Sequence, residues 1–211
     1  MVCELPPRVL EAIKRYQTCY ETETVTGEKR QRSSAYGHGE EECETTLRQD
    51  MKRSHTSEAG RGVHRRTFAF KGRGGEDCVV KVARSPDEGT EANRSEVDDY
   101  RQLKKKVRDN FVPILHSDPQ GWWITEPEVE TDGDALSEVR RNLRKVGAEC
   151  QDLHDANVGY WKRKPVVIDW GFGVSGARCR LKRPIPIDVV RRRPPRRSPA
   201  QMTIPMFGRR R

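Results

Sequence analysis

The stretch from residue 152 to residue 171 constrains this chain more than any other. It reads DLHDANVGYWKRKPVVIDWG, and it sets Asp152, Asn157 and Asp169 around a short apolar run, Val166–Ile168. The apolar run predicts a buried strand, and oxygen-bearing side chains in the loops at its ends can converge on one hard cation. We therefore expect metal ligands here, with Asp152 left to act as a base. The alternative is ordinary turn chemistry, because Asp and Asn side chains commonly bond to their own backbone.

A lysine lies inside a second apolar run, CVVKVAR at residues 78–84. The alternation of a strand places Val80 on one face and Lys81 on the other. Residues 93–107 carry an apolar stripe at helical spacing, and Glu96 is the one charged member of that stripe. Because a buried ammonium without a counter-charge is costly, we expect Lys81 and Glu96 to form an ion pair. The alternative is a lysine that snorkels from an edge strand and a glutamate at the margin of its helix.

Taken in chain order, these signals resemble the protein-kinase-like fold, and in particular its small, reduced members. The run from Cys150 to Asn157 resembles the catalytic loop H-R-D-L-x-x-x-N, in the D-L-H-x-x-N form of many small-molecule kinases. The triplet DWG at 169–171 resembles the metal-binding D-F-G. The run Cys78–Lys81 matches the family's V-A-I-K more loosely, but its order and its distance from Glu96 fit.

The resemblance implies a role for each of these side chains. Asp152 would be the catalytic base, and Lys81 paired with Glu96 would position the α- and β-phosphates of ATP. Asn157 and Asp169 would hold Mg²⁺. The implied activity is ATP·Mg²⁺-dependent phosphoryl transfer to an unknown hydroxyl acceptor. The alternatives are a nucleotide-binding pseudokinase or interaction module, and a nucleic-acid-associated protein that acts through its basic tail.

A glycine pair stands where the family has its phosphate-covering hairpin. Gly60 and Gly62 match the first two positions of G-x-G-x-x-G, whose glycines let backbone N–H groups approach phosphate oxygens. They are therefore predicted to bind the nucleotide. Arg65 replaces the third glycine, so Arg61, Arg65 or Arg66 would contact phosphate through a guanidinium group. A plain basic loop is the alternative.

Three further runs have the composition of short strands. They are Thr67–Phe70, Phe111–Leu115 and Gly121–Thr125. The last resembles the final strand of the kinase small lobe. Glu126, which follows it, lies where the family's hinge would bind an adenine edge through backbone groups.

Helical spacing predicts two more helices. One covers 136–146, with Asp134 as its N-cap and Gly147 as its stop. The other covers 9–20 near the N-terminus. Residues 21–59 have almost no aliphatic side chains, which indicates a linker or a polar, helix-prone segment, in part disordered.

The basic residues are concentrated at the C-terminus. Residues 178–211 contain 12 Lys or Arg and one acid, a net charge of +11, whereas the other 177 residues carry 29 basic and 31 acidic groups, a net charge of −2. Such a tail can bind nucleic acid or another polyanion by releasing condensed counterions. The alternatives are a solubilising tail and a docking arm for an acidic protein partner.

The six cysteines are scattered, without a C-x-x-C pair. This pattern argues against a zinc site and indicates reduced thiols, as in a cytoplasmic protein. The N-terminus lacks the apolar core of a secretory signal, and no run reaches about 18 apolar residues. We therefore expect no membrane partner.

Together these features predict an α+β chain with a kinase-like, two-lobe fold. The small lobe would be an antiparallel sheet plus a helix, and the helical large lobe would be strongly reduced, because only 40 residues follow Gly171. The expected parts are an N-terminal helix with a polar segment over 1–59, a kinase-like core over 60–177 and a basic, Arg/Pro-rich tail over 178–211.

Overall fold

The computed structural model divides the chain into two units, 1–181 and 182–211. It describes residues 3–25, 38–150, 153–170 and 180–181. All of these lie in the first unit, so the predicted basic tail lies outside the described residues apart from Arg180 and Leu181.

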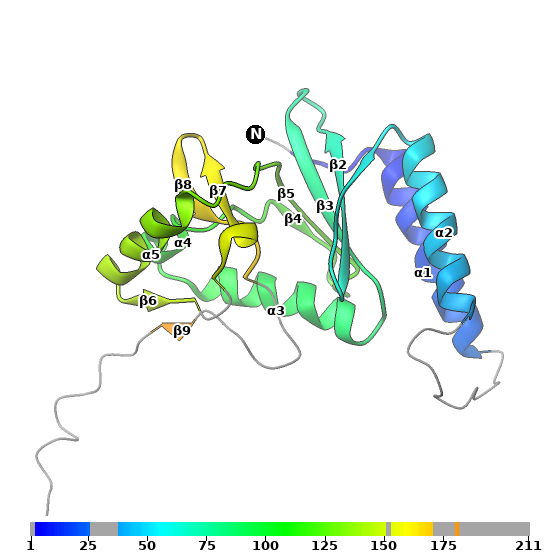
Figure 1. Cartoon of the computed structure of the whole chain (residues 1–211). Coiled ribbons are helices and arrows are strands. Elements are labelled where there is room, and N and C mark those ends of the chain that lie inside the picture. The colour runs from blue at the N-terminus through cyan, green and yellow to red at the C-terminus, as the bar shows by residue number, and fades with distance from the viewer. Residues whose placement is uncertain (1–2, 26–37, 151–152, 171–179, 182–211) are drawn as a thin grey trace, which may run out of the picture. The chain divides into compact units, whose positions relative to one another are not determined.

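A five-stranded antiparallel sheet lies at the centre of the described unit (Figure 1), with strand order β1-β2-β3-β5-β4. The strands are β1 Ser57–Arg61, β2 Arg65–Lys71, β3 Asp77–Ala83, β4 His116–Ser117 and β5 Trp123–Pro127. The predicted strands at 67–70 and 78–84 correspond to β2 and β3, and that at 121–125 corresponds to β5, shifted by two residues.

The strand predicted over Phe111–Leu115 is wrong. Phe111 forms only an isolated bridge with Val167, and regular pairing with β5 begins at His116. The segment contains Pro113, which has no N–H to donate to a ladder.

Different helices cover the two faces of the sheet. Between β2 and β3, Phe68 pairs with Val80 on one face, and Thr67 pairs with Lys81 on the other. The first face packs against α1 (Pro7–Val25) and α2 (His38–Arg53), which lie side by side in Figure 1. On the other side, α3 (Glu88–Gln102) packs against β3 and β5.

The N-terminal region belongs to the same structural unit as the sheet. α2 buries Cys43, Leu47 and Met51 in one hydrophobic cluster with residues of α1, β2 and β3. The predicted division at residue 59 therefore does not separate two structural units. Of the two alternatives for 21–59, the polar helix is present at 38–53. Its buried apolar side chains recur every four residues, a stripe too narrow to stand out among so many charged neighbours.

Two disulfides join segments that are distant in sequence. Cys3 is bonded to Cys78 of β3, and Cys19 of α1 is bonded to Cys43 of α2. Cys150 is also disulfide-bonded. The prediction of reduced thiols is therefore wrong, because the fold brings together cysteines that no local spacing connects. The argument for a cytoplasmic location, which depended on reduced thiols, no longer holds.

The remaining elements are α4 Lys105–Arg108, α5 Ala135–Lys145, β6 Ala148–Glu149, a 3₁₀ turn at Asp155–Asn157, β7 Val158–Trp161, β8 Lys164–Val167 and β9 Arg180–Leu181. A second hydrophobic cluster includes residues of α4, α5, β6, β7 and β8. Within the described ranges, no helix combines the length and the apolar character needed to cross a bilayer.

Two helix predictions need correction. The helix expected over 93–107 is divided into α3 and α4, because Leu103 takes an extended conformation at the end of α3. The helix expected over 136–146 is α5, and Gly147 follows it with a φ of 72°, as a glycine stop does. The Asp134 side chain does not cap α5. Instead, the Asp132 carboxylate accepts a hydrogen bond from the Asp134 N–H.

The turn before β5 fixes the position of α3. Gly121 has a φ of 87°, and a Cβ there would lie 2.4 Å from the Thr90 carbonyl oxygen. The Asn93 side chain of α3 donates a hydrogen bond to the Gly121 carbonyl oxygen at 2.8 Å. Only glycine permits this approach, so α3 lies directly against the sheet. The result is a mixed α+β fold with an antiparallel sheet and several helices, which confirms the predicted fold class.

Candidate functional site

Lys81 lies in β3 on the face of the sheet that α3 covers, and only 3% of it is exposed. Its ammonium group donates to Glu96 Oε1 at 3.0 Å, to Glu126 Oε1 at 3.1 Å and to the Ile168 carbonyl oxygen at 3.0 Å. The predicted ion pair with Glu96 is thus confirmed, and the snorkelling alternative is wrong. A lysine has three N–H donors, and all three have an acceptor within the protein.

Glu126 reaches the site through its side chain. Lys81 pairs with Ile124 across β3 and β5, and strand alternation places Glu126 on the same face. Burial raises the pKa of the Glu126 carboxyl to about 8, although the neighbouring Lys81 acts to lower it. Its Oε2 lies 3.0 Å from the Lys81 ammonium but outside hydrogen-bond geometry, so this oxygen has no hydrogen bond. The sequence interpretation considered only the Glu126 backbone, and the adenine contact stays a prediction.

Arg65, the first residue of β2, reaches the same site from the β1–β2 hairpin. One guanidinium nitrogen, Nη1, donates to the Glu96 carboxylate, and the other, Nη2, donates to the Asp169 carboxylate. Burial would lower the pKa of Arg65, but Asp169 and Glu96 hold it above its ordinary value. Of the three arginines that the sequence offered for phosphate contact, Arg65 is the one found in this site. We call Arg65, Lys81, Glu96, Glu126 and Asp169 the α3-side cluster.

The β7–β8 hairpin brings the two predicted metal ligands to one end. Lys162 and Arg163 form its turn, with positive φ values of 51° and 63°. The Ile168 N–H donates to the Asn157 carbonyl oxygen at 2.8 Å. This hydrogen bond brings Asn157 next to the residue that precedes Asp169. The prediction that the loops carrying Asn157 and Asp169 come close together is therefore confirmed. The connection is a hairpin of two strands rather than the single strand predicted.

The remaining predicted site residues occupy different environments. Asp152 lies outside the described residues, so its role as a base stays a prediction. Gly60 pairs with Thr67 inside the β1–β2 ladder. The Gly62 N–H donates to the Arg65 carbonyl oxygen at 2.9 Å, where it closes the hairpin. In this conformation that N–H is not available to a phosphate oxygen.

The oxygens of Asn157 and Asp169 suit Mg²⁺ chemically, but they are few. Among the described residues, no group of three or more His, Cys, Asp or Glu side chains could hold a metal ion. Mg²⁺ is commonly bound by one or two carboxylates together with substrate phosphates. The donor set therefore holds a divalent cation tightly only with phosphate oxygens as further ligands, and the Arg65 guanidinium already neutralises Asp169.

A second buried ion cluster lies on the opposite face of the sheet, against α2. Arg66 bonds to Glu44 and, at 2.6 Å, to Glu58, while Arg84 bonds to Glu44 at 2.5 Å. Burial would raise the pKa of the Glu44 carboxyl, but hydrogen bonds from Arg66 and Arg84 hold it below its usual range. We call Glu44, Glu58, Arg66 and Arg84 the α2-side cluster.

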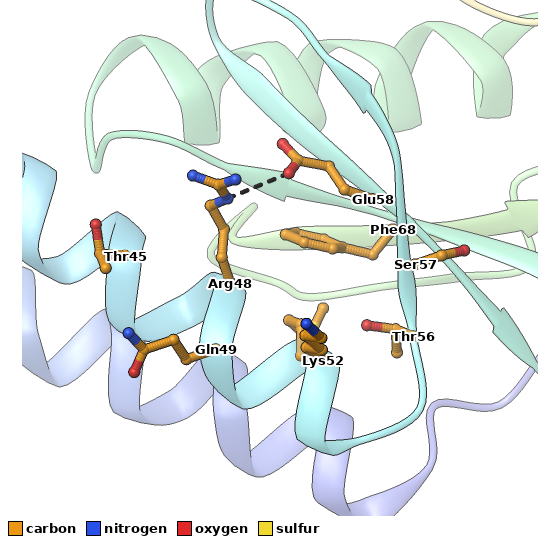
Figure 2. Close-up of a pocket in the computed structure, with 9 residues that line it drawn as sticks. Thr45, Arg48, Gln49, Lys52, Thr56, Ser57, Glu58 and Phe68 are labelled. Carbon is orange, nitrogen blue, oxygen red and sulfur yellow. Dashed lines mark ion pairs between the residues drawn. The ribbon is translucent and has the colours of Figure 1, made fainter.

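A pocket of about 520 Å³ opens beside this second cluster, between α2 and β1 (Figure 2). Phe68 and Met51 lie among its lining residues, and Arg48 crosses it to pair with Glu58 at 3.2 Å. Phe68 points to the face of the sheet opposite Lys81, so this pocket is separate from the α3-side cluster.

The comparisons with known proteins give no family for this chain. No family model matches the chain, and no curated protein matches it. One solved structure that resembles it is the crystal structure of a kinase domain, at 13% identity and a TM-score of 0.41. The match covers 54% of this chain and 48% of that one, so it spans about half of the kinase domain.

Proposed function

We propose that this protein is an ATP·Mg²⁺-dependent phosphotransferase of the kinase-like type, acting on a hydroxyl acceptor. The observation that supports the proposal is the position of Lys81. Its ammonium joins the α3 carboxylate of Glu96 to the backbone of Ile168, one residue before Asp169. A strand, a helix and a loop thus bring Lys81, Glu96 and Asp169 close together, with Arg65 bonded to both carboxylates.

Each residue has a distinct task in this proposal. Glu96 orients Lys81, which binds the α- and β-phosphates once its ammonium exchanges an internal acceptor for a phosphate oxygen. Asn157 and Asp169 hold Mg²⁺, which when bound neutralises charge on the phosphate oxygens. Asp152 accepts the proton of the attacking hydroxyl.

A nucleotide-binding pseudokinase is the second candidate, and one observation favours it. Both cations of the site are already satisfied by the protein, since Lys81 has three internal acceptors and Arg65 bonds to Glu96 and Asp169. A nucleotide that binds without displacing these partners lacks the Lys81–phosphate contact that phosphoryl transfer needs.

Incubation with γ-labelled ATP and Mg²⁺ tests both candidates. The wild-type protein should transfer or hydrolyse the γ-phosphate, and both Asp152→Ala and Asp169→Asn should lose at least about 99% of that rate. Arg73→Ala is the matched control, because Arg73 is an exposed arginine that pairs with Glu4 outside the site.

The outcomes separate the two candidates. Calorimetric binding of ATP without turnover in the wild-type protein would favour the pseudokinase. Turnover that survives in both Asp variants would show that the activity arises elsewhere or from a contaminant, and the phosphotransferase proposal would be wrong.

A further inference from the structure

The β1–β2 hairpin carries several arginines, and their surroundings differ sharply. Arg61 is exposed at the end of β1. Arg66 is held between Glu44 and Glu58 on the α2 side of the sheet. Arg65 is 8% exposed and enters the α3-side cluster, because neighbouring residues of a strand point to opposite faces. Among these three, only Arg65 can reach a ligand beside Lys81 without a change of strand register.

The two partners of Arg65 are unequally accessible. The Glu96 side chain is fully buried, whereas 46% of the Asp169 side chain is exposed. The guanidinium presents several N–H groups in a rigid planar fork, so one nitrogen can keep its partner while the other changes partner. Nη1, on the fully buried Glu96, is the fixed end, and Nη2, on the half-exposed Asp169, is the end that can change partner.

Asp169 cannot serve Arg65 and a metal ion equally well at once. A guanidinium and a divalent cation compete for the same carboxylate oxygens, and the positive charge of one repels the other. A phosphate group is the usual alternative partner of an arginine fork. Transfer of Nη2 from Asp169 to a phosphate would therefore satisfy the arginine and expose the carboxylate to a metal ion.

We propose that Arg65 is a phosphate-binding residue that occupies Asp169 until a nucleotide arrives, and so keeps a divalent cation from binding first. This inference rests on the proposed nucleotide site. In this proposal, the Arg65 side chain contacts phosphate in place of the backbone N–H groups of a glycine loop. The Gly62 N–H is not available for that contact, because it donates a hydrogen bond inside the hairpin.

The proposal predicts opposite effects on two ligands when Arg65 is removed. In Arg65→Ala, Mn²⁺ alone should bind about tenfold more tightly than to the wild-type protein, because its competitor is gone. ADP without metal should bind about tenfold more weakly, because a phosphate contact is lost. A merely structural role would weaken both. Electron paramagnetic resonance measures free Mn²⁺, and calorimetry measures ADP.

Three further variants make the experiment decisive. Arg73→Ala removes an exposed arginine from the β2–β3 turn and should change neither affinity by more than about twofold. Arg65→Ala combined with Asp169→Asn should lose the gain in Mn²⁺ affinity, which locates that gain at Asp169. Arg65→Lys keeps a positive charge beside Glu96 but removes the planar guanidinium group that bonds to two partners at once. If Arg65→Ala does not fold, Arg65→Lys should show the same two opposite changes at smaller size.

Two failures would be distinguishable. If ADP binds the wild-type protein but Arg65→Ala leaves Mn²⁺ affinity unchanged or lowers both affinities, the role of Arg65 is wrong and the proposed function stands. If no variant binds ADP or ATP with or without metal, the nucleotide site is wrong and the phosphate role of Arg65 falls with it.

Discussion

The two faces of the sheet each bury an ion cluster, and the two clusters are built differently. The α2-side cluster has two arginines and two glutamates, which balance. The α3-side cluster has two cations and three carboxylates, so one negative charge is in excess when all are ionised. Arg65 and Arg66 are adjacent in β2, yet each belongs to a different cluster.

The carboxyl groups of the two clusters also differ in acidity. In the α2-side cluster, hydrogen bonds from two arginines hold the pKa of Glu44 low, as in a structural ion network. In the α3-side cluster, burial raises the pKa of Glu126 to about 8, and one of its oxygens lacks a hydrogen bond. Strongly perturbed acids gather at functional sites. The comparison therefore supports a structural role for the α2 side and the ligand-binding role proposed for the α3 side.

The largest effect should come from Lys81→Met. This change leaves Glu96 and Glu126 buried without their shared cation, and it should lower the free energy of unfolding by about 3–5 kcal/mol. Urea denaturation at pH 7 measures the loss. Lys71→Met is the control, because Lys71 pairs with Asp77 on the surface and its loss should cost less than about 1 kcal/mol. A Lys81→Met protein as stable as the control would contradict a buried, charged cluster.

Removal of the disulfides should give the next largest loss of stability. It also tests whether the α2 side is purely structural. Replacing Cys3 and Cys78 by serine should cost about 4 kcal/mol, and replacing Cys19 and Cys43 about 3 kcal/mol, because the first bond closes the longer loop. Denaturation without reductant measures both. The affinity for ADP should stay within about twofold of wild type. A large loss of ADP affinity in a folded variant would break the proposed division between the faces.

Arg66→Met should have an intermediate effect, about 2 kcal/mol, because Glu44 keeps Arg84 and Glu58 keeps Arg48. Thermal or urea unfolding measures the loss, and Mn²⁺ and ADP binding serve as the second readout. Unlike Arg65→Ala, this variant should leave both affinities unchanged. If it shifts them in the way proposed for Arg65, the two arginines are not functionally distinct.

Glu126→Gln should have the smallest effect, and the effect should depend on pH. Glu126 has a folded pKa of about 8 against an ordinary value of 4.5. As the pH rises through this window, the unfolded chain loses the proton first, so wild-type stability falls. The amide of the variant cannot ionise, so the variant should gain at least about 1 kcal/mol relative to wild type between about pH 5 and pH 8. Urea denaturation at several pH values checks this, and a pH-independent difference would mean that Glu126 is ionised in the fold.

The sequence by itself determined those features that depend on local periodicity and order. Alternation in β3 placed Lys81 opposite to Val80, and the stripe in α3 singled out Glu96, so their ion pair could be predicted without a structure. The apolar run before Asp169 indicated that Asn157 and Asp169 return to one place. These inferences succeed because a side chain's face is fixed by the repeat of its own element.

Only the tertiary structure decided which faces meet. Arg65 and Asp169 are separated by 104 positions, and no local pattern shows that Arg65, rather than Arg61 or Arg66, bonds to Asp169. The Cys3–Cys78 bond, 75 positions apart, likewise depends on α1 and α2 folding back over the sheet. The Glu126 side chain enters the site because β5 pairs with β3 in one register. Each of these contacts is set by packing between elements, and a sequence specifies that packing only through the whole fold.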